Sequence, residues 1–130
     1  MKRMIPILLM MTLLTGCTAS NPVAEANTYR QITMQEAVEM MEKEENYIIL
    51  DVRTHEEFAA GHIPGAIVIP NETIGTEDIP QLSDKDQLIM VYCRSGNRSK
   101  QASDKLVKLG YTNIIEFGGI NSWPGEIVTD

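Results

Sequence analysis

The apolar run Gln87–Tyr92 constrains the fold most, because it leads without a break into a turn and then into a helical pattern. The run reads QLIMVY, and the helical pattern extends from about Ser99 to Leu109 and ends at Gly110. A second continuous apolar run, Tyr47–Val52, has the same character. Such runs are typical of parallel strands that are buried on both faces. The sequence therefore predicts an α/β fold in which helices flank both faces of a central parallel β-sheet.

Two capping boxes mark the starts of two more helices. Thr33 pairs with Glu36, and the apolar residues that follow recur at helical spacing over residues 34–44. Thr54 and Glu57 form the second box, which predicts a short helix. The alternation of helices with apolar strands supports the α/β assignment.

The remaining segments carry weaker patterns. Ala66–Ile69 and Ile114–Phe117 are expected to be short strands. The segment Asn71–Asp86 is polar, and one short helix is the most that it predicts.

The first residues have the pattern of a secretory signal. Lys2 and Arg3 supply positive charge, and the apolar stretch Ile5–Leu14 is too short to span a bilayer. We therefore expect residues 1–16 to be a signal peptide that is removed from the mature protein.

The end of this stretch resembles the lipobox of bacterial lipoproteins. Thr15 and Gly16 precede Cys17, and in a lipobox the cysteine becomes the lipidated first residue of the mature chain. The resemblance implies lipidation of Cys17, a lipidated tether over residues 17–28 and a folded domain over residues 29–130. The alternative is an ordinary secretory cleavage site with Cys17 as a bystander.

The charge of the chain limits its partners. The formal net charge is −7 over 130 residues, and it becomes −9 once residues 1–16, with their two basic groups, are removed. An acidic body of this kind does not suit nucleic acid or anionic lipid headgroups. We expect no nucleic-acid partner and a membrane attachment made by the lipid alone. The expected location is a bacterial membrane, with the domain outside the cytoplasm.

Cysteine usage limits the chemistry. Once Cys17 is lipidated, Cys93 is the one thiol left in the sequence. This count excludes a disulfide framework and a CxxC redox pair. Two histidines, His55 and His62, beside one cysteine argue against a structural zinc site. We predict neither a metal nor an organic cofactor.

The segment that starts at Cys93 is the expected functional loop, because it joins a strand end to a helix start, where open α/β sheets bind ligands. Free amides and the helix dipole favour an anion at this place, and Arg94 and Arg98 add two cations. Gly96 allows the backbone to turn its amides inward. These effects favour the thiolate, which is the nucleophilic form of cysteine. The predicted substrate-binding residues of the loop are Arg94, Ser95, Gly96, Asn97 and Arg98.

Inert packing is the alternative for a lone cysteine at a strand end, since free cysteine is among the most buried residue types. The residues after Cys93 favour the anion site instead. They read Arg-Ser-Gly-Asn-Arg-Ser, whereas packing would require apolar neighbours.

Four segments, in order, resemble a single rhodanese domain, and the resemblance extends from about Ile32 to Trp123. The segments are Asp51-Val52-Arg53, Glu57–Ala66, the loop that starts at Cys93, and Gly118–Trp123. The loop has four residues between Cys93 and Arg98, which is C-x4-R. The corresponding loop of cysteine-dependent phosphatases resembles C-x5-R, which is one residue longer and wide enough to fit a phosphate.

The resemblance implies roles for individual residues. Cys93 matches the family's catalytic cysteine, which cycles between thiolate and persulfide, and the loop amides match those that hold the outer sulfur. Arg53 matches a position at which an arginine helps to bind an anionic donor, although a structural ion pair with a carboxylate is the alternative. We expect Asp51 and His62 to be structural.

The implied function is that of a thiosulfate sulfurtransferase. A sulfane sulfur would pass from thiosulfate or a similar small anionic donor to Cys93, and then to a thiol or cyanide. One alternative is a sulfur-relay module that carries a persulfide to a protein partner. Another is an enzyme similar to a phosphatase or arsenate reductase, which the short loop and the lack of a second thiol disfavour. We expect a monomer.

Overall fold

The computed structural model describes residues 28–75 and 77–129, and a parallel five-stranded sheet forms its centre. The strand order is β1-β5-β4-β2-β3, and each pairing is parallel. The strands are β1 (Arg30–Gln31), β2 (Tyr47–Asp51), β3 (Ile67–Val68), β4 (Leu88–Cys93) and β5 (Ile114–Gly119). The expected signal peptide, Cys17 and the tether up to residue 27 lie outside the described residues.

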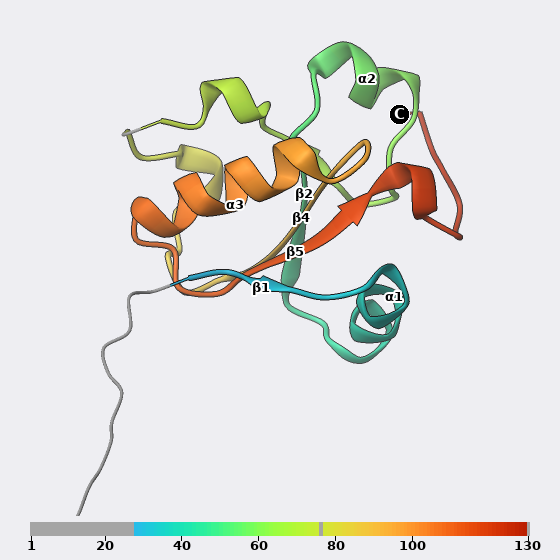
Figure 1. Cartoon of the computed structure of the whole chain (residues 1–130), viewed down its shortest axis with the longest axis horizontal. Helices are drawn as coiled ribbons and strands as arrows, with labels where there is room; N and C mark the ends of the chain where they lie inside the picture. Colours follow the sequence, from blue (N-terminus) through green and yellow to red (C-terminus); the bar gives the residue numbers. More distant parts are fainter. Residues whose placement is uncertain (1–27, 76, 130) are drawn as a thin grey trace, which may run out of the picture.

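Helices cover both faces of the sheet, as predicted. The α-helices are α1 (Met34–Lys43), α2 (His55–Ala60) and α3 (Asn97–Lys108), and three short 3-10 helices are η1 (Asn71–Thr73), η2 (Pro80–Leu82) and η3 (Ile120–Ser122). Figure 1 shows α1 and α3 on opposite sides of the strands. Within the described ranges, no helix is long and apolar enough to cross a membrane.

Both predicted capping boxes are formed, and they begin α1 and α2. The Thr33 hydroxyl accepts from the Glu36 amide at 3.0 Å, and the Glu36 carboxylate accepts from the Thr33 amide at 2.8 Å. Thr54 and Glu57 make the same reciprocal pair. Each box satisfies amide donors that have no partner inside the helix, and this local requirement places the first turn of the helix.

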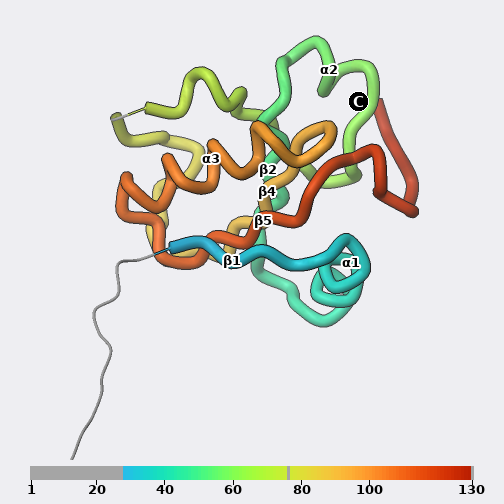
Figure 2. Tube along the Cα trace, in the orientation of Figure 1, coloured from blue at the N-terminus to red at the C-terminus, as the bar shows by residue number. Residues whose placement is uncertain are grey.

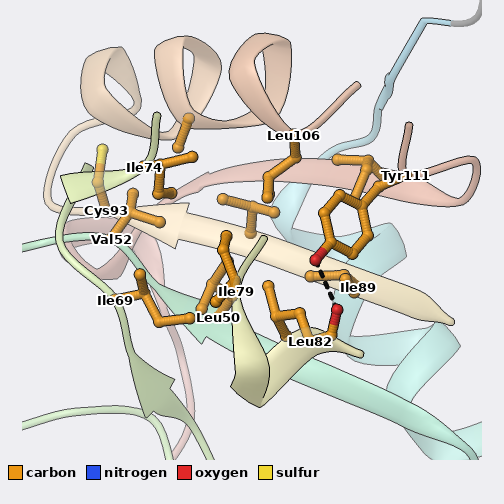
Figure 3. Packing of buried hydrophobic residues seen from close by; sticks show 13 residues of the cluster. Leu50, Val52, Ile69, Ile74, Ile79, Leu82, Ile89, Cys93, Leu106 and Tyr111 are labelled. Carbon is orange, nitrogen blue, oxygen red and sulfur yellow. Dashed lines mark hydrogen bonds between the residues drawn. The ribbon is translucent and has the colours of Figure 1, made fainter. Parts of the chain in front are cut away.

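The sheet separates two hydrophobic clusters. Successive side chains of a strand point to opposite faces, so Leu50 and Val91 face α3 whereas Ile49 and Met90 belong to the cluster that also holds Ala37 of α1. Figure 3 shows the cluster on the α3 side, with Cys93 at one end. Among its members in this view are Leu50, Val52, Ile69, Ile74, Ile79, Leu82, Ile89, Leu106 and Tyr111. At the other end of this cluster the Tyr111 hydroxyl donates to the Leu82 carbonyl at 2.5 Å.

The structure departs from the expected elements in several places, among them the unpredicted η3. Strand β1 was not predicted, because two exposed residues give no periodic signal. Two 3-10 helices, η1 and η2, replace the one short helix expected in the segment from Asn71 to Asp86. Helix α3 begins at Asn97, two residues before the expected Ser99, because Gly96 serves as its N-cap with φ 113°.

Candidate active site

Cys93 is the last residue of β4, and the turn after it leads directly into α3. In a parallel sheet the carboxyl ends of neighbouring strands meet at one edge. Cys93 therefore lies next to Gly119 at the end of β5 and close to the end of β2. Figure 2 shows α2 and the turn after β4 at this same end of the molecule.

The sulfur of Cys93 receives an inward-facing backbone amide. The Gly96 N–H donates to Cys93 Sγ, with 3.0 Å between nitrogen and sulfur. The φ of Gly96 is 113°, a left-handed conformation that glycine adopts without steric cost. A backbone N–H fixed in this way can stabilise negative charge that develops on its acceptor. The turn thus directs one backbone donor at the sulfur.

Cys93 is buried but not surrounded by apolar groups alone. Cys93 is 1% exposed and belongs to the hydrophobic cluster on the α3 side of the sheet. Its sulfur lies 3.0 Å from the Gly96 nitrogen and 3.5 Å from Ser99 Oγ. Inert packing gives no reason for these two polar contacts.

A buried carboxylate, that of Glu116, is linked to the Cys93 sulfur through the hydroxyl of Ser99. Ser99 Oγ donates to Glu116 Oε2 at 2.5 Å, and the Gly118 N–H donates to the same oxygen at 3.0 Å. The side-chain amide of Gln31 donates to the other carboxylate oxygen, Glu116 Oε1, at 3.2 Å. Glu116 is 2% exposed, so these donors satisfy a carboxylate that has little access to water. Glu116 was missed at the sequence level, although a single acidic residue inside the apolar run Ile114–Phe117 was a usable signal.

Arg98 is held by a carboxylate, which the sequence did not reveal. Its Nη1 lies 2.7 Å from Glu57 Oε1 and its Nη2 lies 3.1 Å from Glu57 Oε2. The hydrogen bonds from Arg98 lower the pKa of the Glu57 carboxyl from 4.5 to about 2. The same bonds raise the pKa of the Arg98 guanidinium. Arg98 is one of the two cations predicted in the loop, and its positive charge is therefore balanced by the Glu57 carboxylate.

The other predicted loop residues lie at the surface of the turn. Arg94, Ser95 and Asn97 are exposed, and the ion pairs found between described residues do not include Arg94. Arg94 is thus a cation available to a ligand at the turn.

Arg53, which the resemblance assigns to donor binding, lies in a buried ion pair. Arg53 Nη2 lies 2.7 Å from Asp51 Oδ2 and also donates to the Gly61 carbonyl at 2.7 Å, while Nε contacts both Asp51 oxygens. The Tyr92 hydroxyl donates to Asp51 Oδ2 at 2.6 Å, and Arg53 is 6% exposed. Arg53 forms the structural ion pair that was the alternative, because a buried guanidinium requires these partners.

The two histidines lie in different environments, His62 buried and His55 exposed. His62 is 3% exposed, its ring stacks on Phe58 with 3.6 Å between centroids, and Nδ1 lies 2.8 Å from the Phe58 carbonyl oxygen. His55 is exposed on α2. In the described part of the chain, no three His, Cys, Asp or Glu side chains gather as a metal site.

The end of β5 supports the turn through a close backbone approach. A Cβ added at Gly119 would lie 2.0 Å from the Arg94 carbonyl oxygen, so no larger residue fits. The same carbonyl accepts from the Asn121 N–H at 3.2 Å. Gly119 therefore allows the end of β5 to lie directly against the backbone of the turn.

Fold and site together define a parallel α/β protein with a buried cysteine at a strand end, whose sulfur accepts a hydrogen bond from the Gly96 amide of the following turn. The family model of the Rhodanese-like domain matches residues 33–126, and the chain belongs to the rhodanese family.

Two curated relatives and one solved structure illustrate the relationship. Thiosulfate sulfurtransferase PspE of Escherichia coli is 35% identical over 71 residues, covering 55% of this chain and 68% of the relative. Adenylyltransferase and sulfurtransferase UBA4 of Candida albicans is 34% identical over 95 residues, which cover 68% of this chain but only 22% of that protein. The chain thus spans about a fifth of UBA4. A structure titled as a rhodanese with anions from E. coli is 33% identical with a TM-score of 0.58, covering 65% of this chain and 99% of that one. These relatives support sulfur transfer as the general activity.

Proposed function

We propose that this protein transfers a sulfane sulfur from thiosulfate or a similar donor to a thiol or cyanide, through a persulfide on Cys93. The observation that carries the proposal is the Gly96 N–H at 3.0 Å from Cys93 Sγ, at the start of α3. A fixed amide and a helix amino terminus stabilise a sulfur anion without having to reorganise during the reaction. The sulfurtransferase relative PspE supports the same chemistry.

The proposed reaction has two halves. The Cys93 thiolate attacks the outer sulfur of thiosulfate, a new S–S bond forms, and the donor's S–S bond breaks with its electron pair leaving on sulfite. A thiolate or cyanide then attacks the outer sulfur of the persulfide, and Cys93 leaves as a thiolate. Charge is conserved in each half, and no external oxidant or reductant takes part.

The residues of the turn have separate roles in this proposal. The amide of Gly96 lies against the sulfur, and the exposed side chains of Arg94, Ser95 and Asn97 contact the anionic part of the donor. A guanidinium and side-chain donors suit the oxygens of a sulfonate-like group. The relative's structure that was solved with anions supports an anion site in this fold.

Cyanolysis tests the proposal. Purified protein incubated with thiosulfate and cyanide should release thiocyanate, and Cys93→Ser should release none above the uncatalysed background. Absence of Cys93-dependent thiocyanate, with other thiosulfonate donors also inactive, rejects the assignment.

A sulfur relay to a protein partner is a second candidate. The relative UBA4 favours it, because that protein combines a sulfurtransferase with a second activity and this chain matches only 22% of it. A relay predicts that the persulfide forms stoichiometrically but that cyanide and small thiols discharge it slowly. Fast discharge by small acceptors favours the sulfurtransferase.

Membrane attachment is a separate proposal, which rests on the sequence alone. We propose that Cys17 carries lipid after residues 1–16 are removed and that residues 17–28 tether the domain outside the cytoplasm. Cys17→Ala should move the protein from the membrane fraction to the soluble fraction of expressing bacteria. Equal membrane retention of the variant contradicts lipidation at this residue.

A further inference from the structure

The Arg98–Glu57 ion pair leaves the turn with less positive charge than its sequence suggests. Nη1 and Nη2 of Arg98 each donate to a carboxylate oxygen of Glu57, at 2.7 and 3.1 Å. The side chain of Arg98 is 27% exposed and that of Glu57 is 29% exposed. Glu57 has a pKa of about 2, so it is ionised at neutral pH. Arg98 also lies in the field of Glu72. The positive charge of Arg98 is thus matched by carboxylates before any donor arrives.

We propose that Glu57 determines the charge preference for the sulfur donor, because it competes with a dianionic donor for Arg98 and thereby favours donors with one negative charge. This inference rests on the proposed sulfur transfer. A dianion gains more than a monoanion when a nearby carboxylate is removed, since the repulsion scales with the donor's charge. Glu57 is a positioning residue in this account, as it acts on the donor through Arg98.

Glu57 has a second function that the test must keep intact. Its carboxylate accepts from the Thr54 amide at 3.0 Å, and its own amide donates to Thr54 Oγ1 at 3.1 Å, which caps α2. Glutamine satisfies the same capping box. Glu57→Gln therefore removes the charge and leaves the helix cap in place.

Glu56 provides a matched control. It lies next to Glu57 in the first turn of α2 and is exposed, and it forms no ion pair with another described residue. Glu56→Gln changes the net charge by the same amount on the same helix. A difference between the two variants reports the contact with Arg98 and not the net charge.

The experiment compares two donors that differ by one charge. Thiosulfate is a dianion and methanethiosulfonate is a monoanion, and each presents one outer sulfur to the nucleophile. The quantities to compare are kcat and KM for each donor, with cyanide as the acceptor. Glu57→Gln should raise the ratio of kcat/KM for thiosulfate to kcat/KM for methanethiosulfonate by about tenfold, mainly through KM, which is the size expected for one unit charge close to a partly exposed site. Glu56→Gln should change the ratio by less than about twofold.

A purely structural role of Glu57 predicts a different result. Loss of packing or of the helix cap would lower activity with both donors equally and leave the ratio unchanged, and that outcome overturns the proposal.

Arg98→Gln provides an independent test, because it leaves Glu57 unpaired beside the donor. This variant should lower the ratio, and the double variant Glu57→Gln/Arg98→Gln should bring it back toward the wild-type value. An unchanged ratio in Arg98→Gln also overturns the proposal. If the wild-type protein turns over neither donor, that result contradicts the proposed sulfur transfer itself. An unchanged ratio in an active protein contradicts only the role of Glu57.

Discussion

At the scale of single residues, the site depends on backbone conformation more than on side-chain chemistry. Gly96 turns an amide toward the sulfur because its φ of 113° is accessible to glycine. Gly119 allows the Arg94 carbonyl to approach within a distance that any Cβ would block. Cys93 is an ordinary cysteine, and two glycines shape the backbone around it.

Gly96→Ala tests the role of the inward amide. A Cβ at Gly96 would find Gly118 Cα at 3.8 Å, which is an ordinary contact, so the cost is conformational. A left-handed alanine costs about 1–2 kcal/mol, and relief of this strain turns the amide away from Cys93. We expect kcat/KM for sulfur transfer to fall by about tenfold or more, since 1.4 kcal/mol corresponds to tenfold.

Gly65→Ala is the control for this variant. Gly65 also has a positive φ, 86°, and no atom lies within 4 Å of its added Cβ. It should lose a similar amount of stability in urea unfolding but retain the activity of the folded protein. Equal loss of activity in both variants contradicts a specific role for the Gly96 amide.

Glu116→Ala tests whether the buried carboxylate holds the nucleophile's surroundings in place. The Ser99 hydroxyl and the Gly118 amide would lose their common acceptor inside the protein. Loss of charged hydrogen bonds to buried donors costs about 3 kcal/mol, which chemical denaturation measures. The exposed Glu126 provides the control, and Glu126→Ala should change stability by less than about 0.5 kcal/mol. A variant of Glu116 as stable as the wild type contradicts the account.

At the scale of elements, α2 is coupled to the turn through one ion pair. Glu57 caps α2 and also holds Arg98 at the start of α3, although 41 residues separate the two in sequence. The short helix and the turn after Cys93 therefore share a carboxylate, and a change in its charge affects both elements.

The ion pair predicts a specific dependence of stability on pH. The pKa of Glu57 is lowered from 4.5 to about 2 in the folded protein, so the folded state binds the proton less tightly than the unfolded state. This contribution is complete above about pH 4.5 and is lost as the pH falls toward 2. The partly exposed position limits it to about 1 kcal/mol.

Urea unfolding of the wild type and of Glu57→Gln measures this contribution. The wild type should be more stable at pH 7, and the difference should disappear between pH 4.5 and pH 2. The Glu56→Gln variant corrects for the change in net charge. A difference that stays constant down to pH 2 shows that the ion pair does not supply it.

At the scale of the whole molecule, local patterns predicted most of the fold. The capping boxes and the continuous apolar runs act within a few residues, so α1, α2, β2 and β4 follow from short stretches of sequence. The parallel sheet follows from their alternation. Strand β1 was missed because it exists only through its pairing with β5.

The site was predicted in part for the same reason. Cys93 and the inward amide of Gly96 lie in one turn, and local rules describe them. The partners of Arg98 and Ser99 depend on tertiary contacts, because they come from other elements, Glu57 and Glu116. Counting the charges of the loop therefore overestimated its positive charge, because the sequence does not show which carboxylate folds back onto Arg98.

The most direct test of the account follows one sulfur atom. Thiosulfate labelled with a heavy isotope only in its outer sulfur is incubated with the protein, and mass spectrometry then locates the label. The account predicts one labelled sulfur on the peptide that contains Cys93, with unlabelled sulfite released in equal amount. An unmodified Cys93, or label found elsewhere in the protein, contradicts it.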